Sequence, residues 1–367
     1  MSDNSQYRCW AEVDLAAIRS NARVAQQHLG DGSSLLAVIK ANGYGHGLGV
    51  VAAALKKEAQ LFGVANVEEA IEACAAVSHP VMILGPALPS ERREIIERGF
   101  IASISSFAEA QEFSALASET PAAVVCVIDT GMGRMGIAER HAVEELRRIA
   151  ALPRIHIHSV SSHLPVADDD VDYTRDQLAR FRTVITAVRA AVPGDYLVHT
   201  LPTAGVFRFA DSALDLARAG LMLYGATSVS EFQPLLTPAM TLKTRVALLR
   251  DVPAGSSISY GRTFTTRRKS RIATLSAGYA DGLPRAVSGR GAVLIGGRRC
   301  PILGRVTMDL TMVDVTDVPK VALGDEAVLI GTQGEEQILV TEVAQWASTI
   351  AWEIFTGIGS RVARVYV

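Results

Sequence analysis

Alternation between short apolar runs and amphipathic helical patterns is the feature that most constrains the fold of this chain. Strand-like runs are expected at 36–40, 61–65, 81–84, 101–104, 124–128, 155–161, 196–201 and 214–219. Helical patterns fall between them, at 50–58, 67–76, 90–98, 107–116, 138–151 and 173–191. About eight strand–helix units in roughly 200 residues are typical of an α/β fold built as a closed parallel (β/α)8 barrel of the TIM type.

The pattern changes near residue 235, where β-branched runs are separated by Pro and Gly turns. These runs, at 240–249, 258–260, 271–276, 292–295, 308–315 and 326–330, predict a mainly antiparallel β domain. Single helices are expected near the two ends, over 12–30 and 341–355. We therefore expect a barrel domain over 11–234 and a β-rich domain over 235–367, with which the first ten residues pair.

Charge and composition favour a small-molecule partner. Lys plus Arg (36) nearly balance Asp plus Glu (38), so no basic surface predicts nucleic-acid binding. The apolar runs are too short to span a membrane, and the polar start lacks the apolar core of a signal peptide. The sequence contains no HExxH motif and no Cys/His cluster, so it does not predict a metal site. The two alternating histidines of the 155–161 strand, His156 and His158, are expected to be structural.

The four cysteines are widely spaced and form no C-x-x-C motif. Cys9, Cys74, Cys126 and Cys300 are therefore expected to be buried free thiols of a protein in a reducing compartment. The sequence predicts the cytosol.

A lysine ends the first barrel strand and is followed by a glycine-rich turn. Lys40 closes the apolar run 35–39, and Tyr44 and His46 lie in the turn. Burial disfavours an ammonium group, and lysines in such places often act as amines, forming a Schiff base or moving a proton. The three glycines would let the backbone turn tightly and approach a ligand. A solvated lysine at a strand terminus is the open alternative for this segment by itself.

Other polar residues fall at or just after expected strand ends. They are Lys40, the segment 129–134, His163, Thr203 and Arg218. Chemistry in (β/α)8 barrels takes place where strands end and the following loops begin. We therefore expect these residues to converge at one mouth of the barrel.

Five long motifs resemble those of alanine racemases. They are VIKANGYGHG at 38–47, DTGMGRMG at 129–136, SYGRTF at 259–264, AGYADGLPR at 277–285 and GRVTMDLTMVDV at 304–315. The resemblance covers essentially the whole chain. It implies a pyridoxal-phosphate-dependent isomerase that interconverts L- and D-alanine, the D-isomer being a peptidoglycan precursor. It also implies a homodimer with each active site shared across the interface, and no membrane partner.

The resemblance implies two catalytic bases. Lys40 would carry the cofactor and act on one face of the substrate, and Tyr260 of the partner subunit would act on the other. Arg218, in RAGLMLYG, would contact the pyridine nitrogen, and His163 would support Arg218. A guanidinium can only donate hydrogen bonds, so it would leave that nitrogen unprotonated. The plain structural alternatives are a packed tyrosine at 260, a salt-bridged arginine at 218 and a satisfied core histidine at 163.

Further roles follow by the same resemblance. The phosphate would be held by Tyr44, the Thr203 hydroxyl and the N–H groups of Gly220 and Leu221. The substrate would be bound by Arg134 and by Met308 and Tyr279 of the partner subunit. Residues expected to line the entrance, besides Tyr279, are Asp168, Arg285 and Arg305.

The chain departs from the family pattern at four places. Val127 stands where many members have a carbamylated lysine that anchors the carboxylate-binding arginine, so Arg134 needs another support. Pro202-Thr203 replaces an Asn-Ser pair, Trp352 replaces a tyrosine, and 164–166 replaces a more polar or aromatic stretch. Substrate preference is therefore open, with alanine first and serine or another small amino acid as the alternative.

Two other classes of protein share this type of barrel. A decarboxylase of basic amino acids would prefer a carboxylate at the pyridine nitrogen, which disagrees with Arg218. A small pyridoxal-phosphate-binding homeostasis protein would lack the β domain that carries Tyr260. An inactive binding protein stays open from sequence, although intact Lys40 and Tyr260 favour an enzyme.

Overall fold

A closed parallel barrel forms the first part of the chain, in a computed structural model that describes residues 4–367. Its strands are β2 (Ser34–Val38), β3 (Leu61–Val64), β4 (Val81–Pro86), β5 (Ile101–Ile104), β6 (Ala122–Asp129), β8 (Ile155–Ser161), β9 (Leu197–His199) and β10 (Leu216–Ala219). Each strand pairs in parallel with the next, and β10 closes the ring by pairing with β2. The predicted (β/α)8 barrel is confirmed.

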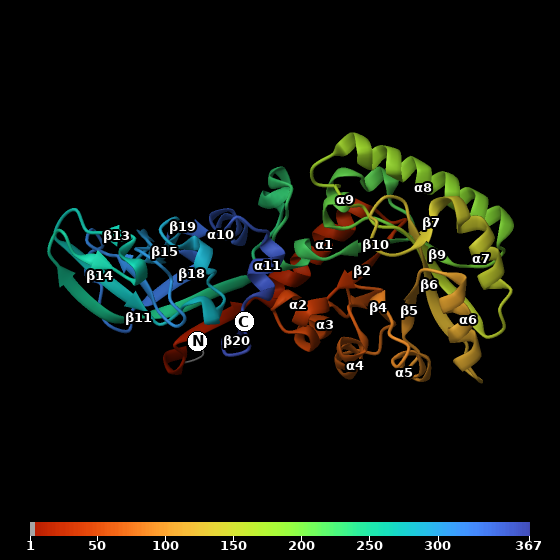
Figure 1. Ribbon diagram of the computed structural model, residues 1–367, viewed down its shortest axis with the longest axis horizontal. Coiled ribbons are helices and arrows are strands. Elements are labelled where there is room, and N and C mark those ends of the chain that lie inside the picture. Colours follow the sequence, from red (N-terminus) through yellow and green to blue (C-terminus); the bar gives the residue numbers. More distant parts are fainter. Residues whose placement is uncertain (1–3) are drawn as a thin grey trace.

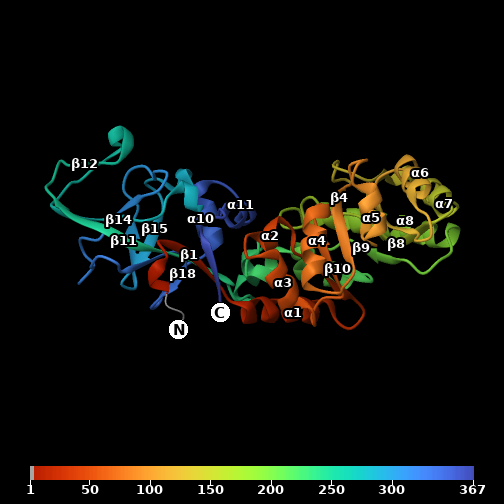
Figure 2. The same cartoon turned by 90° about the horizontal axis from the view of Figure 1, so that it is seen from below.

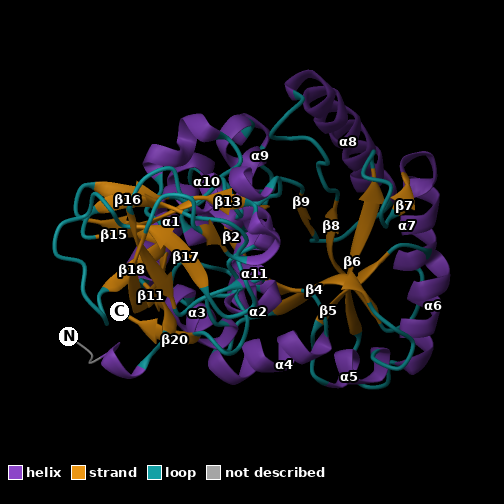
Figure 3. Cartoon of the chain, turned by 60° about the vertical axis from the view of Figure 1, so that its left-hand side comes forward, coloured by secondary structure: helices purple, strands orange, loops and turns teal. Residues whose placement is uncertain are grey.

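Helices surround this ring (Figure 3). They are α1 (Leu15–Leu29), α3 (Leu48–Leu55), α4 (Val67–Ala76), α5 (Arg92–Glu97), α6 (Phe107–Leu116), α7 (Ala142–Ala150), α8 (Val171–Ala191) and α9 (Thr203–Arg208). The α1 helix begins later than predicted because Asp14 caps it by accepting hydrogen bonds from the N–H groups of Ala16 and Ala17. The α7 helix also begins later, because β7 (Ile137–Ala138) first pairs with β6.

A second sheet lies beside the barrel (Figure 1). Its strands are β1 (Cys9–Val13), β11 (Met240–Val252), β14 (Ser270–Leu275), β15 (Ala292–Ile295), β16 (Arg298–Pro301), β17 (Thr311–Asp314), β18 (Glu326–Gln333), β19 (Glu336–Ile338) and β20 (Ala363–Tyr366). All its pairings are antiparallel except β1 with β20. The predicted antiparallel architecture is confirmed.

The N-terminal segment joins this second sheet through β1. Cys9 pairs with Thr244 of β11 and Val13 pairs with Met240. Residues 1–3 of the predicted pairing segment lie outside the described residues. The chain passes from β10 to β11 through 3-10 turns, including Leu221–Tyr224 and Ser230–Leu235. A domain boundary at 234/235 stays a prediction.

The prediction of a single helix over 341–355 is wrong. The segment forms two helices, α10 (Val340–Ala347) and α11 (Ala351–Thr356). Ser348 between them has φ of +57°, a left-handed conformation that cannot continue a right-handed helix. The break places α11 against the turn that follows Lys40.

In the second domain, the strands expected over 258–260 and 308–315 are shorter than predicted, and each omits a candidate site residue. Tyr260 opens a 3-10 turn (Tyr260–Arg262) between β12 (Ser257–Ile258) and β13 (Phe264–Thr265). This β12–β13 arm projects from the second sheet in Figure 2. Met308 lies in the loop before β17. Both side chains are therefore carried by loops.

The expectation that all four cysteines are buried is wrong for Cys74. All four are free, but Cys74 is exposed because α4 turns Ala70 and Ala73 to the core and the next residue to solvent. Within residues 4–367 no helix is long and apolar enough to cross a membrane. The same part of the chain has no group of three His, Cys, Asp or Glu residues placed to hold a metal.

Candidate active site

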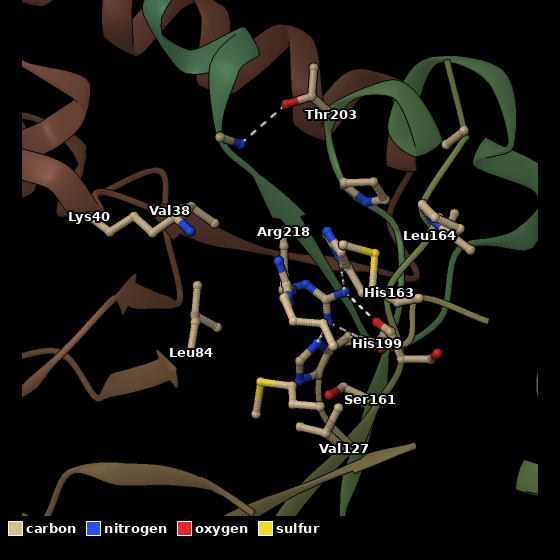
Figure 4. A pocket seen from close by; sticks show the side chains of 18 of the residues that line it. Val38, Lys40, Leu84, Val127, Ser161, His163, Leu164, His199, Thr203 and Arg218 are labelled. Atoms are coloured by element: carbon tan, nitrogen blue, oxygen red, sulfur yellow. Dashed lines mark hydrogen bonds between the residues drawn. The ribbon is translucent and has the colours of Figure 1, made fainter. Parts of the chain in front are cut away.

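A cavity of about 790 Å³ opens at the carboxyl ends of the barrel strands. Residues from all eight barrel strands or from the loops that follow them line it, and Figure 4 shows part of this lining. The predicted residues among its lining are Lys40, Tyr44, Arg134, His163, Asp168, Thr203, Arg218, Gly220 and Leu221. Burial of strand ends under the loops thus brings together side chains that are as much as 181 residues apart in the sequence.

Lys40 begins a short turn, α2 (Lys40–Tyr44), whose backbone is left-handed. Ala41, Asn42 and Tyr44 have φ of 53°, 54° and 52°, and Gly43 between them has the same hand. A left-handed conformation costs roughly 1–2 kcal/mol for each residue other than glycine. Hydrogen bonds offset this cost: Asn42 accepts from the N–H of Leu48 through its side chain, and from the N–H of Gly47 through its carbonyl. The turn fixes the direction in which Lys40 leaves the strand.

Two glycines of this turn are required by the second domain. A Cβ on Gly45 would lie 2.3 Å from the carbonyl oxygen of Phe355, and one on Gly47 would lie 2.1 Å from the Tyr366 hydroxyl. We expected the glycines to allow close approach to a ligand. At Gly45 and Gly47 the close approach is instead to α11 and β20.

The Lys40 amine is half-buried at the cavity wall. Burial is the main cause that lowers its pKa below the usual value, and the positive charge of Arg134 lowers it further. The carboxylate of Glu69 opposes both effects. This environment increases the fraction of neutral amine, the form that can act as a nucleophile or a base.

Arg218 lies in β10 with only 8% of its surface exposed. Its Nη1 bonds to Nδ1 of His199 at 2.5 Å, and its Nη2 bonds to Nδ1 of His163 at 3.2 Å. Nη2 also donates to the carbonyl oxygens of Ser162 and Thr200. Burial lowers the pKa of Arg218 to about 10, which leaves it charged at neutral pH. Within residues 4–367, no atom accepts a hydrogen bond from Nε–H of this guanidinium, whereas both Nη groups have acceptors.

Both histidines beside Arg218 are neutral. Burial and the Arg218 charge lower the pKa of His163 to about 3 and that of His199 well below 6.5. Because Nδ1 accepts from Arg218 in each, Nε2 carries the proton. In His199 this Nε2 faces the Ser159 hydroxyl at 3.3 Å. Sequence reasoning found His163 and missed His199, although its place at the end of β9 was the signal that identified the others.

A group of small donors lies on the opposite side of the cavity from this histidine pair (Figure 4). The Thr203 hydroxyl is 3.3 Å from the N–H groups of both Gly220 and Met222. A Cβ on Gly220 would lie 2.7 Å from the Tyr44 hydroxyl, so this hydroxyl and the Gly220 backbone are close neighbours. Met222 is a donor that the sequence analysis missed.

Tyr44 is held between aromatic neighbours. Its ring stacks on Tyr224 with centroids 4.7 Å apart, and the Tyr224 hydroxyl donates to the carbonyl of Val38. Burial raises the pKa of Tyr44 to about 12, and a hydrogen bond with Trp352 partly opposes this. Tyr44 is therefore protonated, and Trp352, one of the departures from the family pattern, lies beside it on the cavity wall.

Arg134 is exposed at the cavity mouth, in a loop that Asp129 organises. The Asp129 carboxylate accepts hydrogen bonds from the N–H groups of Gly131, Met132 and Gly133. These bonds lower the pKa of Asp129, although burial opposes them. Behind the loop, Gln177 of α8 donates to the hydroxyl of Thr130 and the carbonyl of His163. The loop backbone is anchored in this way while Val127 contributes only an apolar surface.

Three predicted residues lie outside the cavity of their own chain. Tyr260, Tyr279 and Met308 are 72%, 41% and 53% exposed on loops of the second domain, and none lines the cavity. Arg285 and Arg305 are likewise absent from its lining, whereas Asp168 is part of it. The loops that carry Tyr279 and Met308 lie against each other, because the N–H of Tyr279 donates to the carbonyl of Thr307 and the N–H of Ala280 donates to the carbonyl of Met308.

Comparison with known proteins identifies relatives over the whole chain. Residues 13–228 match the family model described as the N-terminal domain of alanine racemase, and residues 239–366 match that of its C-terminal domain. The chain is 39% identical to the alanine racemase of Halothermothrix orenii over 364 residues, which cover 97% of this chain and 96% of that protein.

Solved structures give the same result. An alanine racemase from Streptomyces lavendulae superposes with a TM-score of 0.91 at 35% identity, covering 98% of this chain and 97% of the other. An alanine racemase from Bartonella henselae, described with covalently bound pyridoxal phosphate, superposes with a TM-score of 0.89 at 29% identity, covering 98% of this chain and all of the other.

Proposed function

Because the chain belongs to the alanine racemase family of enzymes, we propose that it interconverts L- and D-alanine with pyridoxal phosphate held at Lys40. The observation that carries this proposal is the placement of Lys40, Arg218 and the Thr203 donor group around one cavity. Each of these suits a different part of the cofactor. The proposal also assigns the two proton transfers to Lys40 and to Tyr260 of the partner subunit.

The residues of the cavity fit this cofactor. The Lys40 amine would hold its aldehyde carbon, and Nε–H of Arg218 is the donor left over for its ring nitrogen. Tyr44, Thr203, Gly220 and Leu221 offer neutral hydroxyl and N–H donors for its phosphate. When bound, pyridoxal phosphate supplies a carbonyl that joins amines and a π system that accepts the electron pair left when the α-proton departs.

Lys40 is suited to remove or return a proton on one face of the substrate. Burial and the Arg134 charge favour its neutral form, which has a lone pair to accept the proton. The left-handed turn after it limits the directions in which the side chain can extend. Lys40 therefore approaches from the β2 side of the barrel.

Arg218 is suited to keep a ring nitrogen unprotonated. The two histidines beside Arg218 are neutral, so they supply no negative charge that would favour protonation of that ring nitrogen. A ring whose nitrogen only accepts a hydrogen bond from Arg218 would withdraw less electron density from the substrate than a ring with a protonated nitrogen. We infer that the site limits the lifetime of the carbanion and so disfavours decarboxylation and transamination.

The second base is proposed to be Tyr260 of the partner subunit. A residue 72% exposed on the projecting β12–β13 arm cannot act in the cavity of its own chain, which it does not line. A head-to-tail pair of chains would place this arm, together with Tyr279 and Met308, over the cavity mouth of the neighbour. The same arrangement would bury their exposed apolar surface.

Substrate recognition is proposed to rest on Arg134 and on the partner's Met308 and Tyr279. Arg134 would pair with the substrate carboxylate, and the Asp129-organised loop would hold it in place. Three of the residues that depart from the family pattern line the cavity, namely Val127, Pro202 and Trp352. The preferred substrate is therefore open to an amino acid other than alanine. Serine is the first alternative to test.

The test begins with the absorbance spectrum of the purified protein, with and without borohydride. Reduction followed by peptide mapping should find the cofactor on Lys40, and the same sample should interconvert D- and L-alanine in both directions. A panel including D- and L-serine would compare kcat/KM. Equal or better turnover of serine would overturn alanine as the preferred substrate. Protein without cofactor on Lys40 would overturn the proposal as a whole.

A further inference from the structure

The Glu69 side chain connects two strand–helix units of the barrel. Asn66 caps α4 and accepts a hydrogen bond from the N–H of Glu69. Oε2 of Glu69 then accepts from the N–H of Ala65, at 2.8 Å. A glutamate at the third helical position that accepts from the backbone just before the helix is a common way to begin a helix. This use occupies one carboxylate oxygen.

Helix α6 of the same barrel begins in the same way and shows what capping alone requires. Ser106 accepts from the N–H of Glu109 at 3.2 Å, and Oε2 of Glu109 accepts from the N–H of Ser105 at 2.7 Å. In the described part of the chain, no donor bonds to the other carboxylate oxygen of Glu109, Oε1. Helix capping in this fold is therefore complete with one oxygen.

The second oxygen of Glu69 reaches the turn that carries Lys40. Oε1 accepts a hydrogen bond from the N–H of Ala41 at 2.7 Å. Ala41 follows Lys40 directly and is the first residue in the left-handed conformation. Bonds from N–H groups to a carboxylate are short and strong, so this one can hold a backbone conformation that is unfavourable by itself. It also fixes the peptide plane next to Lys40.

The same carboxylate is the negative charge that faces Lys40. The other ionisable groups around this amine are Arg134 and His163, and His163 is neutral. Arg134 lowers the pKa of Lys40 and Glu69 raises it. Removal of the Glu69 charge would therefore lower the pKa of Lys40 further.

We propose that Glu69 is a positioning residue for Lys40, with one carboxylate oxygen capping α4 and the other holding the Ala41 amide and the left-handed turn in place. This inference rests on the proposed role of Lys40 in the reaction. The matched comparison is Glu69→Gln with Glu109→Gln. Both variants lose the charge of a capping glutamate, but only the first removes a contact with the Lys40 turn.

The first measurement is hydrogen exchange of the Ala41 amide, resolved to single residues by mass spectrometry of the purified protein. Ala41 is exposed, so protection of its amide must come from the bond to Glu69. We expect clear protection in the parent and exchange at least about tenfold faster in Glu69→Gln, but not in Glu109→Gln. An unprotected Ala41 amide in the parent would overturn the inference without any variant.

The second measurement is the pH dependence of kcat. In Glu69→Gln we expect kcat about tenfold lower at the optimum. Its acidic limb should move to lower pH, because the pKa of Lys40 falls. Glu109→Gln should keep the parental profile. Coincident pH profiles and exchange rates for the two variants would reject the inference. A parent protein that fails to racemise any amino acid would instead reject the proposed function, and the exchange result would then test only the hold of Glu69 on the turn.

Discussion

The Arg218 guanidinium and the His199 imidazole form a buried hydrogen-bonded pair, with Nη1 and Nδ1 2.5 Å apart. His199 in turn faces the Ser159 hydroxyl, so the three side chains form a row across β10, β9 and β8. A row on adjacent strands is rigid because the strands themselves are hydrogen-bonded. Side chains in the barrel interior therefore hold Arg218 in place, and only its Nε–H is left for a ligand.

We predict that His199→Ala weakens the support of Arg218. Loss of an acceptor for a buried charged donor costs about 1–3 kcal/mol, which corresponds to roughly tenfold or more in kcat/KM. The visible absorbance of the bound cofactor should shift as well, because Arg218 moves relative to its ring. Steady-state racemisation and absorbance spectra would measure both effects. His156→Ala, on the exposed part of β8, is the control and should match the parent.

We predict that the active site is complete only between two chains. Lys40→Ala and Tyr260→Phe should each lower racemisation by at least about a hundredfold. Mixed subunits of the two variants would contain one site with both changes and one site with neither. Random reassociation should restore about a quarter of the parental activity, since half of the dimers are mixed and each has one intact site. Absence of any recovery, with mixed dimers verified by mass, would show that the site does not span two chains.

We predict that the protein loses stability as the pH falls from 6.5 to about 4. Burial lowers the pKa of His46 to about 4, that of His163 to about 3 and that of His199 well below 6.5. In this window the unfolded chain binds protons that the folded chain does not. The free energy of unfolding therefore decreases with falling pH, by up to about 1.4 kcal/mol per pH unit for each histidine.

Urea unfolding between pH 7.5 and 4.5 would measure this slope. His46→Gln removes one of the three buried imidazoles, and it lies under the Lys40 turn, away from Arg218. Its slope should be smaller than the parental slope by about the contribution of one histidine. Equal slopes would mean that His46 is not held neutral in the folded protein.

We predict that Asp129→Ala disorders the loop that carries Arg134. The variant removes the acceptor for the N–H groups of Gly131, Met132 and Gly133. A displacement of about 1 Å in a substrate-binding group can cost on the order of a hundredfold in rate, so kcat/KM for alanine should fall by about tenfold or more. The loss should appear mainly in KM, because Arg134 binds the carboxylate and does not move the proton.

The control for this variant is Asp176→Ala, which removes a carboxylate from the exposed surface of α8. It should leave KM within about twofold of the parental value, because single exposed ion pairs contribute little. An Asp129→Ala enzyme with parental KM would show that Arg134 is held in place by other contacts, such as those of Gln177.

The periodicity of the sequence determined the barrel and the second sheet. Buried parallel strands must be apolar on both faces, and helices that cover them must be apolar on one, so the order of elements is visible in the residues themselves. The strands β5 and β8 and the helices α4 and α6 begin and end where the sequence predicts. Polar residues at the strand ends, Lys40 and His163 among them, could be found by the same means.

Tertiary structure alone decided the features that depend on contacts between distant segments. The row from Ser159 to Arg218, the bond from Glu69 to the Ala41 amide, and the packing of Gly45 and Gly47 on the second domain leave no local pattern. The break at Ser348 and the exposure of Cys74 were likewise settled by packing. Local sequence constrains the backbone over a few residues, whereas the position of a side chain in a site depends on which remote surfaces the closed barrel brings against it.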